Sequence, residues 1–193
     1  MNLLIIVFVV LTLIVMFMFT YGKRVQMDRL SILLDCKDWE QFDKVADSFL
    51  TKALVKHFDL ESIKLNSYIM RKDTKKIDEQ FDLLSKASKS DIKDINITVR
   101  GFEYYVYEKN RNKAAEYLSH LEKVADKSVT SFCKREYDIL IDGATNHIPQ
   151  LEKEIKESEG QKKYVLAYLL KLSYENDGNG KKAREIEKKY NFK

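Results

Sequence analysis

An uninterrupted apolar run opens the chain. Residues 2–22 carry no charge, and nearly all are Leu, Ile, Val, Phe or Met, with Thr12 as a polar interruption. An α-helix rises 1.5 Å per residue, so this run is about 30 Å long and matches the hydrocarbon core of a bilayer. The pattern predicts an N-terminal transmembrane helix that tethers the rest of the chain to a membrane.

Two other interpretations of this run are open. A cleaved signal peptide has a positive segment before a shorter apolar stretch of about 7–15 residues and a small-residue cleavage site. Here no Lys or Arg precedes the run, and it ends in Phe19, Thr20, Tyr21 and Gly22. A buried core helix is the second alternative, but such a helix carries more polar positions at helical spacing. We therefore favour an uncleaved signal-anchor.

The flanks of the run predict its orientation. Tyr21 suits the membrane interface, and the basic residues Lys23, Arg24 and Arg29 follow, offset by Asp28. The positive-inside bias then places the soluble part in the cytoplasm, with the N-terminus outside the cell membrane. The run has no Gly-x-x-x-Gly pattern that would pack two such helices closely, so a monomeric tether is favoured. Residues 1–24 are the predicted anchor and basic flank.

After the anchor, polar clusters alternate with helical apolar patterns. The clusters occupy residues 36–38, 71–74, 109–112, 143–146 and 176–180, and they recur at roughly 33–37 residues. Apolar residues on both sides of each cluster are spaced by three and four, which places them on one helix face. The sequence therefore predicts an all-α domain over residues 25–193, made of about ten helices in five antiparallel pairs.

Individual residues define these helices. Two of the clearest apolar faces are Trp39, Phe42, Ala46, Phe49, Leu50 and Ala53, and Ile92, Ile95, Val99, Phe102 and Val106. Side chains that can accept hydrogen bonds from free backbone N–H groups precede the second helix of four pairs. These predicted N-caps are Asp38, Thr74, Asn112 and Asn146.

The period resembles that of the tetratricopeptide repeat (TPR), a helix–turn–helix unit of about 34 residues. Residues 112–118 resemble the opening of the family's second helix, with Ala114 at the small position and Leu118 where the family prefers Phe. The family's boundary Pro is missing. The resemblance implies an α-solenoid, in which neighbouring pairs stack to bury their apolar faces. A generic stack of helical hairpins and an irregular helical bundle are open alternatives.

Composition and charge argue against several classes of function. Charged residues form 33% of the 193-residue chain and the net charge is +4, which is too mild for the dense basic face of a nucleic-acid-binding domain. Cys36 and Cys133 lie among apolar neighbours and are expected to be buried, reduced thiols. His57, His120 and His147 lack metal-ligand spacing. We expect no metal, no cofactor and no enzymatic activity.

A predicted binding face lies on the first helices of two pairs. Tyr and Arg often dominate the energetics of protein interfaces. Two rows at helical spacing combine them with Lys: Arg100, Tyr104, Tyr107 and Arg111, and Lys64, Tyr68 and Lys72. They predict a groove for an acidic or extended peptide, although the same residues also suit a solvated surface.

These patterns lead to one main expectation about function. We expect a non-catalytic, membrane-anchored helical-repeat scaffold that binds a protein or peptide partner, and no nucleic acid. A peptide-sensing regulatory subunit of a membrane complex is the alternative. An enzyme is a third possibility, which would need converging carboxylates or His in a concave pocket.

Overall fold

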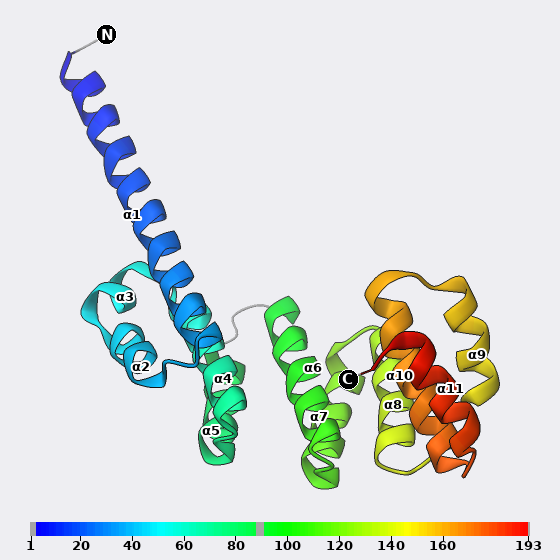
Figure 1. Cartoon of the computed structure of the whole chain (residues 1–193). Helices are drawn as coiled ribbons and strands as arrows, with labels where there is room; N and C mark the ends of the chain where they lie inside the picture. Colours follow the sequence, from blue (N-terminus) through cyan, green and yellow to red (C-terminus); the bar gives the residue numbers. More distant parts are fainter. Residues whose placement is uncertain (1–2, 88–90, 193) are drawn as a thin grey trace. The chain divides into compact units, whose positions relative to one another are not determined.

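The chain is all-α, as predicted. The computed structural model describes residues 3–87 and 91–192, which form eleven α-helices and no strand (Figure 1). The helices group into two compact units that divide between residues 88 and 89, and each unit is described by itself.

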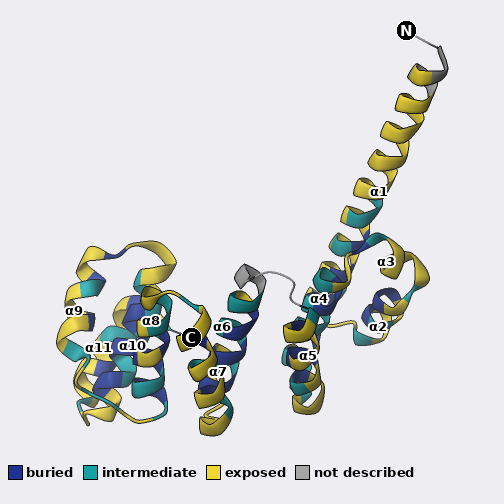
Figure 2. Cartoon of the chain, turned by 180° about the vertical axis from the view of Figure 1, so that it is seen from behind, coloured by how far each residue is buried: buried dark blue, intermediate teal, exposed yellow. Residues whose placement is uncertain are grey.

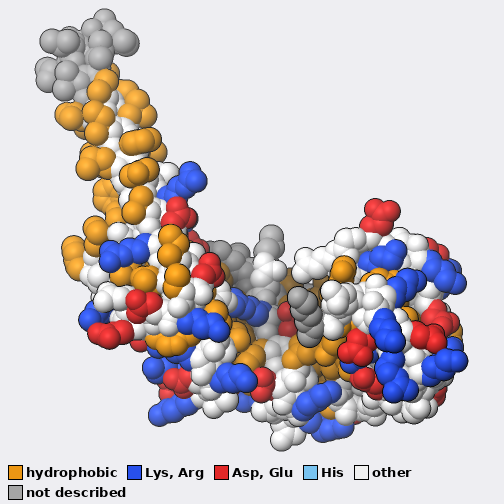
Figure 3. All heavy atoms as spheres, viewed as in Figure 1, with side chains coloured by type: hydrophobic (Ala, Val, Ile, Leu, Met, Phe, Trp, Pro, Cys, Tyr) orange, Lys and Arg blue, Asp and Glu red, His pale blue; other side chains and the backbone are white. Residues whose placement is uncertain are grey.

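The longest helix, α1 (Leu3–Asp35), joins the apolar run to the first unit. It alone among the described helices is long and apolar enough to cross a membrane, and none of that apolar window is buried in the protein. Figures 2 and 3 show its described upper part as exposed and covered with hydrophobic side chains. The absence of burial rules out a core helix of the folded domain. The predicted boundary after residue 24 falls inside this helix, which continues without a break.

The lower part of α1 belongs to the core of the first unit. It packs against α2 (Trp39–Asp47), α3 (Phe49–Leu54) and α4 (His57–Arg71), and α4 packs against α5 (Thr74–Ala87). The core consists of apolar side chains from α1, α2, the α3–α4 link and α4: Leu30, Leu34, Phe42, Val45, Ala46, Val55, Leu60 and Ile63. One helix therefore connects the candidate membrane segment rigidly to this core.

The helix predicted from Trp39 to Ala53 is broken in two. Ser48 has extended backbone angles (φ −63°, ψ 147°), and its Oγ accepts a hydrogen bond from the Thr51 backbone N–H at 3.2 Å. The serine thus caps a new helix, α3. Phe49, Leu50 and Ala53 are exposed there, so the predicted apolar face is wrong beyond Ala46.

The second unit contains six helices. They are α6 (Asp91–Tyr107), α7 (Arg111–Val124), α8 (Lys127–Leu140), α9 (Ile148–Glu157), α10 (Gly160–Asn176) and α11 (Gly180–Tyr190). Helix α6 packs against α7 and α8, and α10 packs against α8, α9 and α11. The first helices of the three predicted pairs, α6, α8 and α10, therefore adjoin in chain order.

One turn geometry recurs in both units. Four turns contain a residue with left-handed backbone angles, namely Lys37, Lys72, Lys109 and Gly178. The backbone N–H of the next residue bonds back to the carbonyl of the residue five positions earlier, at 2.8–3.0 Å. This pairing satisfies carbonyl groups at the helix end, as in a Schellman motif.

The residue after each left-handed position caps the following helix. Asp38, Asp73, Asn110 and Asn179 each accept a hydrogen bond from the backbone N–H three residues later, at 3.2 Å. The predicted cap Asp38 is confirmed. For Thr74 and Asn112 the prediction is wrong by one and two residues, because the earlier Asp73 and Asn110 supply the cap. Asn146 is also wrong, since α9 begins after His147 without a side-chain cap.

A cation–aromatic contact accompanies three of these turns. In each, a Tyr before the turn meets the ammonium group of a Lys eight residues later, 4.8–5.7 Å from the ring centroid. The pairs are Tyr68 with Lys76, Tyr105 with Lys113, and Tyr174 with Lys182. Such contacts contribute on the order of 0.5–1 kcal/mol each at exposed sites. These three turns therefore share a Tyr and a Lys at the same spacing.

Candidate functional site

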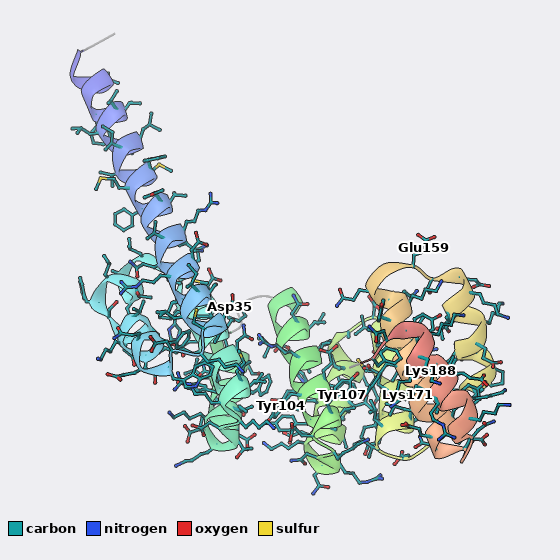
Figure 4. All side chains as sticks on the ribbon, viewed as in Figure 1. Asp35, Tyr104, Tyr107, Glu159, Lys171 and Lys188 are labelled. Atoms are coloured by element: carbon teal, nitrogen blue, oxygen red, sulfur yellow. The ribbon has the colours of Figure 1, made fainter. Side chains whose placement is uncertain are left out.

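Three of the four residues in the predicted row that begins at Arg100 lie on the same helix, α6. Arg100, Tyr104 and Tyr107 lie on α6, and Figure 4 labels the two tyrosines. Arg111 instead begins α7, where its Nη1 lies 2.6 Å from Asp142 Oδ1. Its charge is thus already paired with the loop after α8.

The predicted row on α4 is engaged within the first unit. Lys64 Nζ lies 3.1 Å from Asp47 Oδ1, and the Tyr68 ring is approached by Lys76 and Arg71. Lys72 has left-handed backbone angles and lies just after the helix. These contacts give the α4 row local structural roles. It belongs to a different unit from the α6 row, so each row is considered separately.

A hollow of about 450 Å³ lies on the first-helix side of the second unit. Helices α6, α8 and α10 all contribute to its lining. The lining residues are Glu103, Tyr107, Phe132, Glu136, Gln161, Lys162 and Val165. We call this hollow the Glu136 groove.

Glu136 is the unusual residue of this groove. Its side chain projects from α8, the residue is 2% exposed, and its carboxylate has no hydrogen-bond partner within the described part of the chain. Burial, together with the nearby charge of Glu103, raises the pKa of Glu136 to about 8. Loss of hydration also raises the pKa of Glu103. Two neighbouring carboxyl groups therefore face the groove. Arg135 and Arg100 partly offset the two pKa shifts and Lys162 also lines the groove, but no ion pair joins either carboxyl group to a basic side chain in the described part of the chain.

Two aromatic side chains, Tyr107 and Phe132, line the groove. The Tyr107 ring of α6 lies 6.2 Å from the Tyr168 ring of α10, between centroids. Desolvation, followed by the charge of Glu136, raises the pKa of Tyr107. Glu136 is thus buried beside Phe132 and Tyr107, where an ionised carboxylate is unfavourable.

Two other groups near the groove complete its electrostatics. Desolvation lowers the pKa of Arg100, and the charge of Glu103 opposes that shift. Cys133 is buried as predicted, and burial plus the charges of Glu136 and Glu103 raises its pKa to about 12. Its thiol is therefore unreactive near neutral pH. Cys36 is a free thiol, as predicted, but the prediction that it is buried is wrong because its side chain is exposed.

A second hollow, of about 520 Å³, lies along α8 and the start of α9. Two polar pairs line it: Arg135 Nη1 lies 2.9 Å from Glu154 Oε1, and His147 Nε2 lies 3.2 Å from Asp138 Oδ2. Lys134 and Lys162 also contribute to the lining. The described residues include no cluster of three or more potential metal ligands.

The sequence did not predict that the three histidines lie near carboxylates. Each of the three lies near one carboxylate, His57 near Glu61, His120 near Asp94 and His147 near Asp138. The last two partners are 26 and 9 residues away in sequence, so spacing did not identify them.

Glu136 was also missed, although a signal was present. It follows Phe132 by four residues and precedes Leu140 by four, which places a Glu on the apolar stripe of its helix. An acidic residue at such a position is rarely buried without a partner. Comparisons of the chain with protein-family models, curated proteins and solved structures found no match in any of the three.

Proposed function

We propose that the chain is a single-pass, membrane-anchored helical-repeat scaffold that binds a protein or peptide partner at the membrane surface. In this proposal α1 remains uncleaved and spans the membrane, the helical domain lies in the cytoplasm, and catalysis is not involved. The exposed apolar part of α1 and its rigid continuation into the first core support the tether.

The proposed architecture is a TPR-like α-solenoid over residues 25–193. Two observations support it: the turn that recurs with the same hydrogen bonds, and the adjacency of α6, α8 and α10 in chain order. Repeat proteins of this type commonly bind ligands on an extended concave surface. The Glu136 groove lies on the corresponding helices.

The observation that carries the proposed binding function is the buried carboxyl group of Glu136, which has no hydrogen-bond or ion-pair partner in the described part of the chain. A partner's Lys or Arg side chain entering the groove would give Glu136 the direct ion pair that neither Lys162 nor Arg135 forms with it, and Glu103 would provide a second acceptor. The walls formed by Tyr107, Phe132 and Val165 suit the aliphatic stem of such a side chain. We therefore propose a basic peptide segment as the ligand, in place of the acidic one expected from the sequence.

Selection from a random peptide library tests this proposal. The full chain in detergent would be the bait, and Glu136→Gln would be compared with Glu122→Gln, an exposed substitution on α7. Enrichment of Lys or Arg by the wild type and by Glu122→Gln, but not by Glu136→Gln, is expected. Enrichment of acidic peptides, or identical enrichment by all three proteins, would contradict it.

A further inference from the structure

Two large apolar residues are exposed on the first unit. Phe49 and Leu50, the first residues of α3, are 87% and 54% exposed. Phe49 is more exposed than Phe8 or Phe17 on the apolar segment of α1, at 71% each. Within the same short helix Thr51 is buried, so one side of α3 packs inward and the Phe49–Leu50 end faces outward.

Two contacts hold α3 beside one short stretch of α1. Thr51 Oγ1 donates a buried hydrogen bond to Gln26 Oε1 at 3.1 Å. The side chain of Leu54 lies so close to Gly22 that a Cβ added there would be 3.0 Å from Leu54 Cδ1. Helix α3 is therefore held beside residues 22–26, where the apolar run gives way to charged residues.

The charges near this level suit a lipid surface. Lys23 and Arg24 follow the apolar run, and Lys52 and Lys56 lie on and just after α3. Three of these four residues are ion-paired: Lys23 with Asp59 at 2.7 Å, Arg24 with Asp28 at 3.8 Å and Lys52 with Asp47 at 3.2 Å. Figure 3 shows hydrophobic side chains at the α3 end of this unit, next to α1. Apolar side chains with basic residues beside them are typical of segments that lie in the membrane interface.

We propose that Phe49 and Leu50 insert into the lipid interface and form a second membrane contact beside α1. The proposal rests on the proposed membrane-spanning role of α1. The alignment of α3 with the end of the apolar run argues for lipid as the occupant, because a bilayer around α1 would end at this level. This second contact would limit tilting and rotation of the first unit about its anchor.

Fluorescence quenching by lipids with brominated acyl chains tests the proposal. The full chain would be reconstituted in phosphatidylcholine–phosphatidylglycerol vesicles, with Trp39→Phe to remove the natural Trp. Three single reporters would be compared: Phe49→Trp on α3, Met70→Trp near the other end of α4, and Phe17→Trp on α1. Met70 is a matched control because it is exposed in the same unit but lies 11 residues beyond Asp59, about 16 Å along α4.

The three reporters separate the two proposals. We expect strong quenching at position 17, clear quenching with a blue-shifted emission at position 49, and at least fivefold weaker quenching at position 70. Quenching at position 17 with equal, weak quenching at 49 and 70 would overturn the α3 contact and leave the anchor in place. No quenching at position 17 would overturn the anchor, and the α3 contact with it.

Discussion

At the residue scale, buried polar groups distinguish structural positions from the candidate site. Gln80 Nε2 donates to the Glu61 backbone oxygen at 3.0 Å and to Glu61 Oε2 at 2.8 Å, so that buried pair satisfies itself. Glu136 has no such partner in the described chain. Helical spacing predicted the buried apolar residues, such as Phe102 and Val106, but a polar residue's partner depends on packing between helices.

Glu136 predicts a pH dependence of stability. Its pKa is about 8 in the folded chain against an ordinary value of 4.5, so the folded state binds this proton more tightly than the unfolded state. The free energy of unfolding therefore falls as pH rises from about 4.5 to about 8, by a few kcal/mol at most. Denaturation of the full chain in detergent should show this decline and a smaller one for Glu136→Gln. If the free energy of unfolding depended on pH in the same way in the wild type and in Glu136→Gln, the raised pKa would not belong to Glu136.

Gly101 permits a close approach between α6 and α7. A Cβ at this glycine would lie 2.3 Å from Tyr117 Cε1. Overpacking costs about 1–3 kcal/mol and exceeds the roughly 1 kcal/mol that Ala gains over Gly within a helix. Gly101→Ala should therefore lower the melting temperature, whereas the same change in a Tyr117→Ala background should raise it. If Gly101→Ala shifted the melting temperature in the same direction in both backgrounds, the contact with Tyr117 would not be the cause of the change.

At the element scale, the number and type of the helices were largely predictable, but their ends were less so. Polar clusters such as 71–74 and 109–112 contain several residues able to cap a helix, and the sequence does not reveal which one the turn selects. Lys at a left-handed position also hides the turn, because Gly is the usual residue there. The break at Ser48 was hidden because Phe49, Leu50 and Ala53 continue the helical spacing.

The left-handed positions give a prediction of their own. Lys72 has φ 58°, a conformation that costs an L-residue about 1 kcal/mol but that Gly adopts readily. Lys72→Gly should stabilise the chain by about 0.5–1 kcal/mol, and Gly178→Ala, at φ 73°, should destabilise it by a similar amount. Thermal melts monitored by circular dichroism would measure both. Lys72→Ala, which keeps the Cβ, is the control and should change little.

At the scale of the whole molecule, the two cysteines provide a natural test of topology. Cys36 is exposed at the end of α1, while Cys133 is buried with a pKa of about 12. A membrane-impermeant maleimide should therefore label only Cys36. If the domain is cytoplasmic, labelling of intact cells should fail and should appear after lysis, and Cys36→Ser should abolish it. Labelling of intact cells would place the domain outside.

Site-specific photo-cross-linking in intact cells can show whether the Glu136 groove holds a partner at the membrane. A photoreactive amino acid would replace Gln161, which lines the groove, or Val124 on α7 as a control. We expect a discrete adduct from position 161 that is lost when Glu136→Gln is added, and none from position 124. Equal adducts from both positions, or an adduct from 161 unaffected by Glu136→Gln, would contradict the proposed binding.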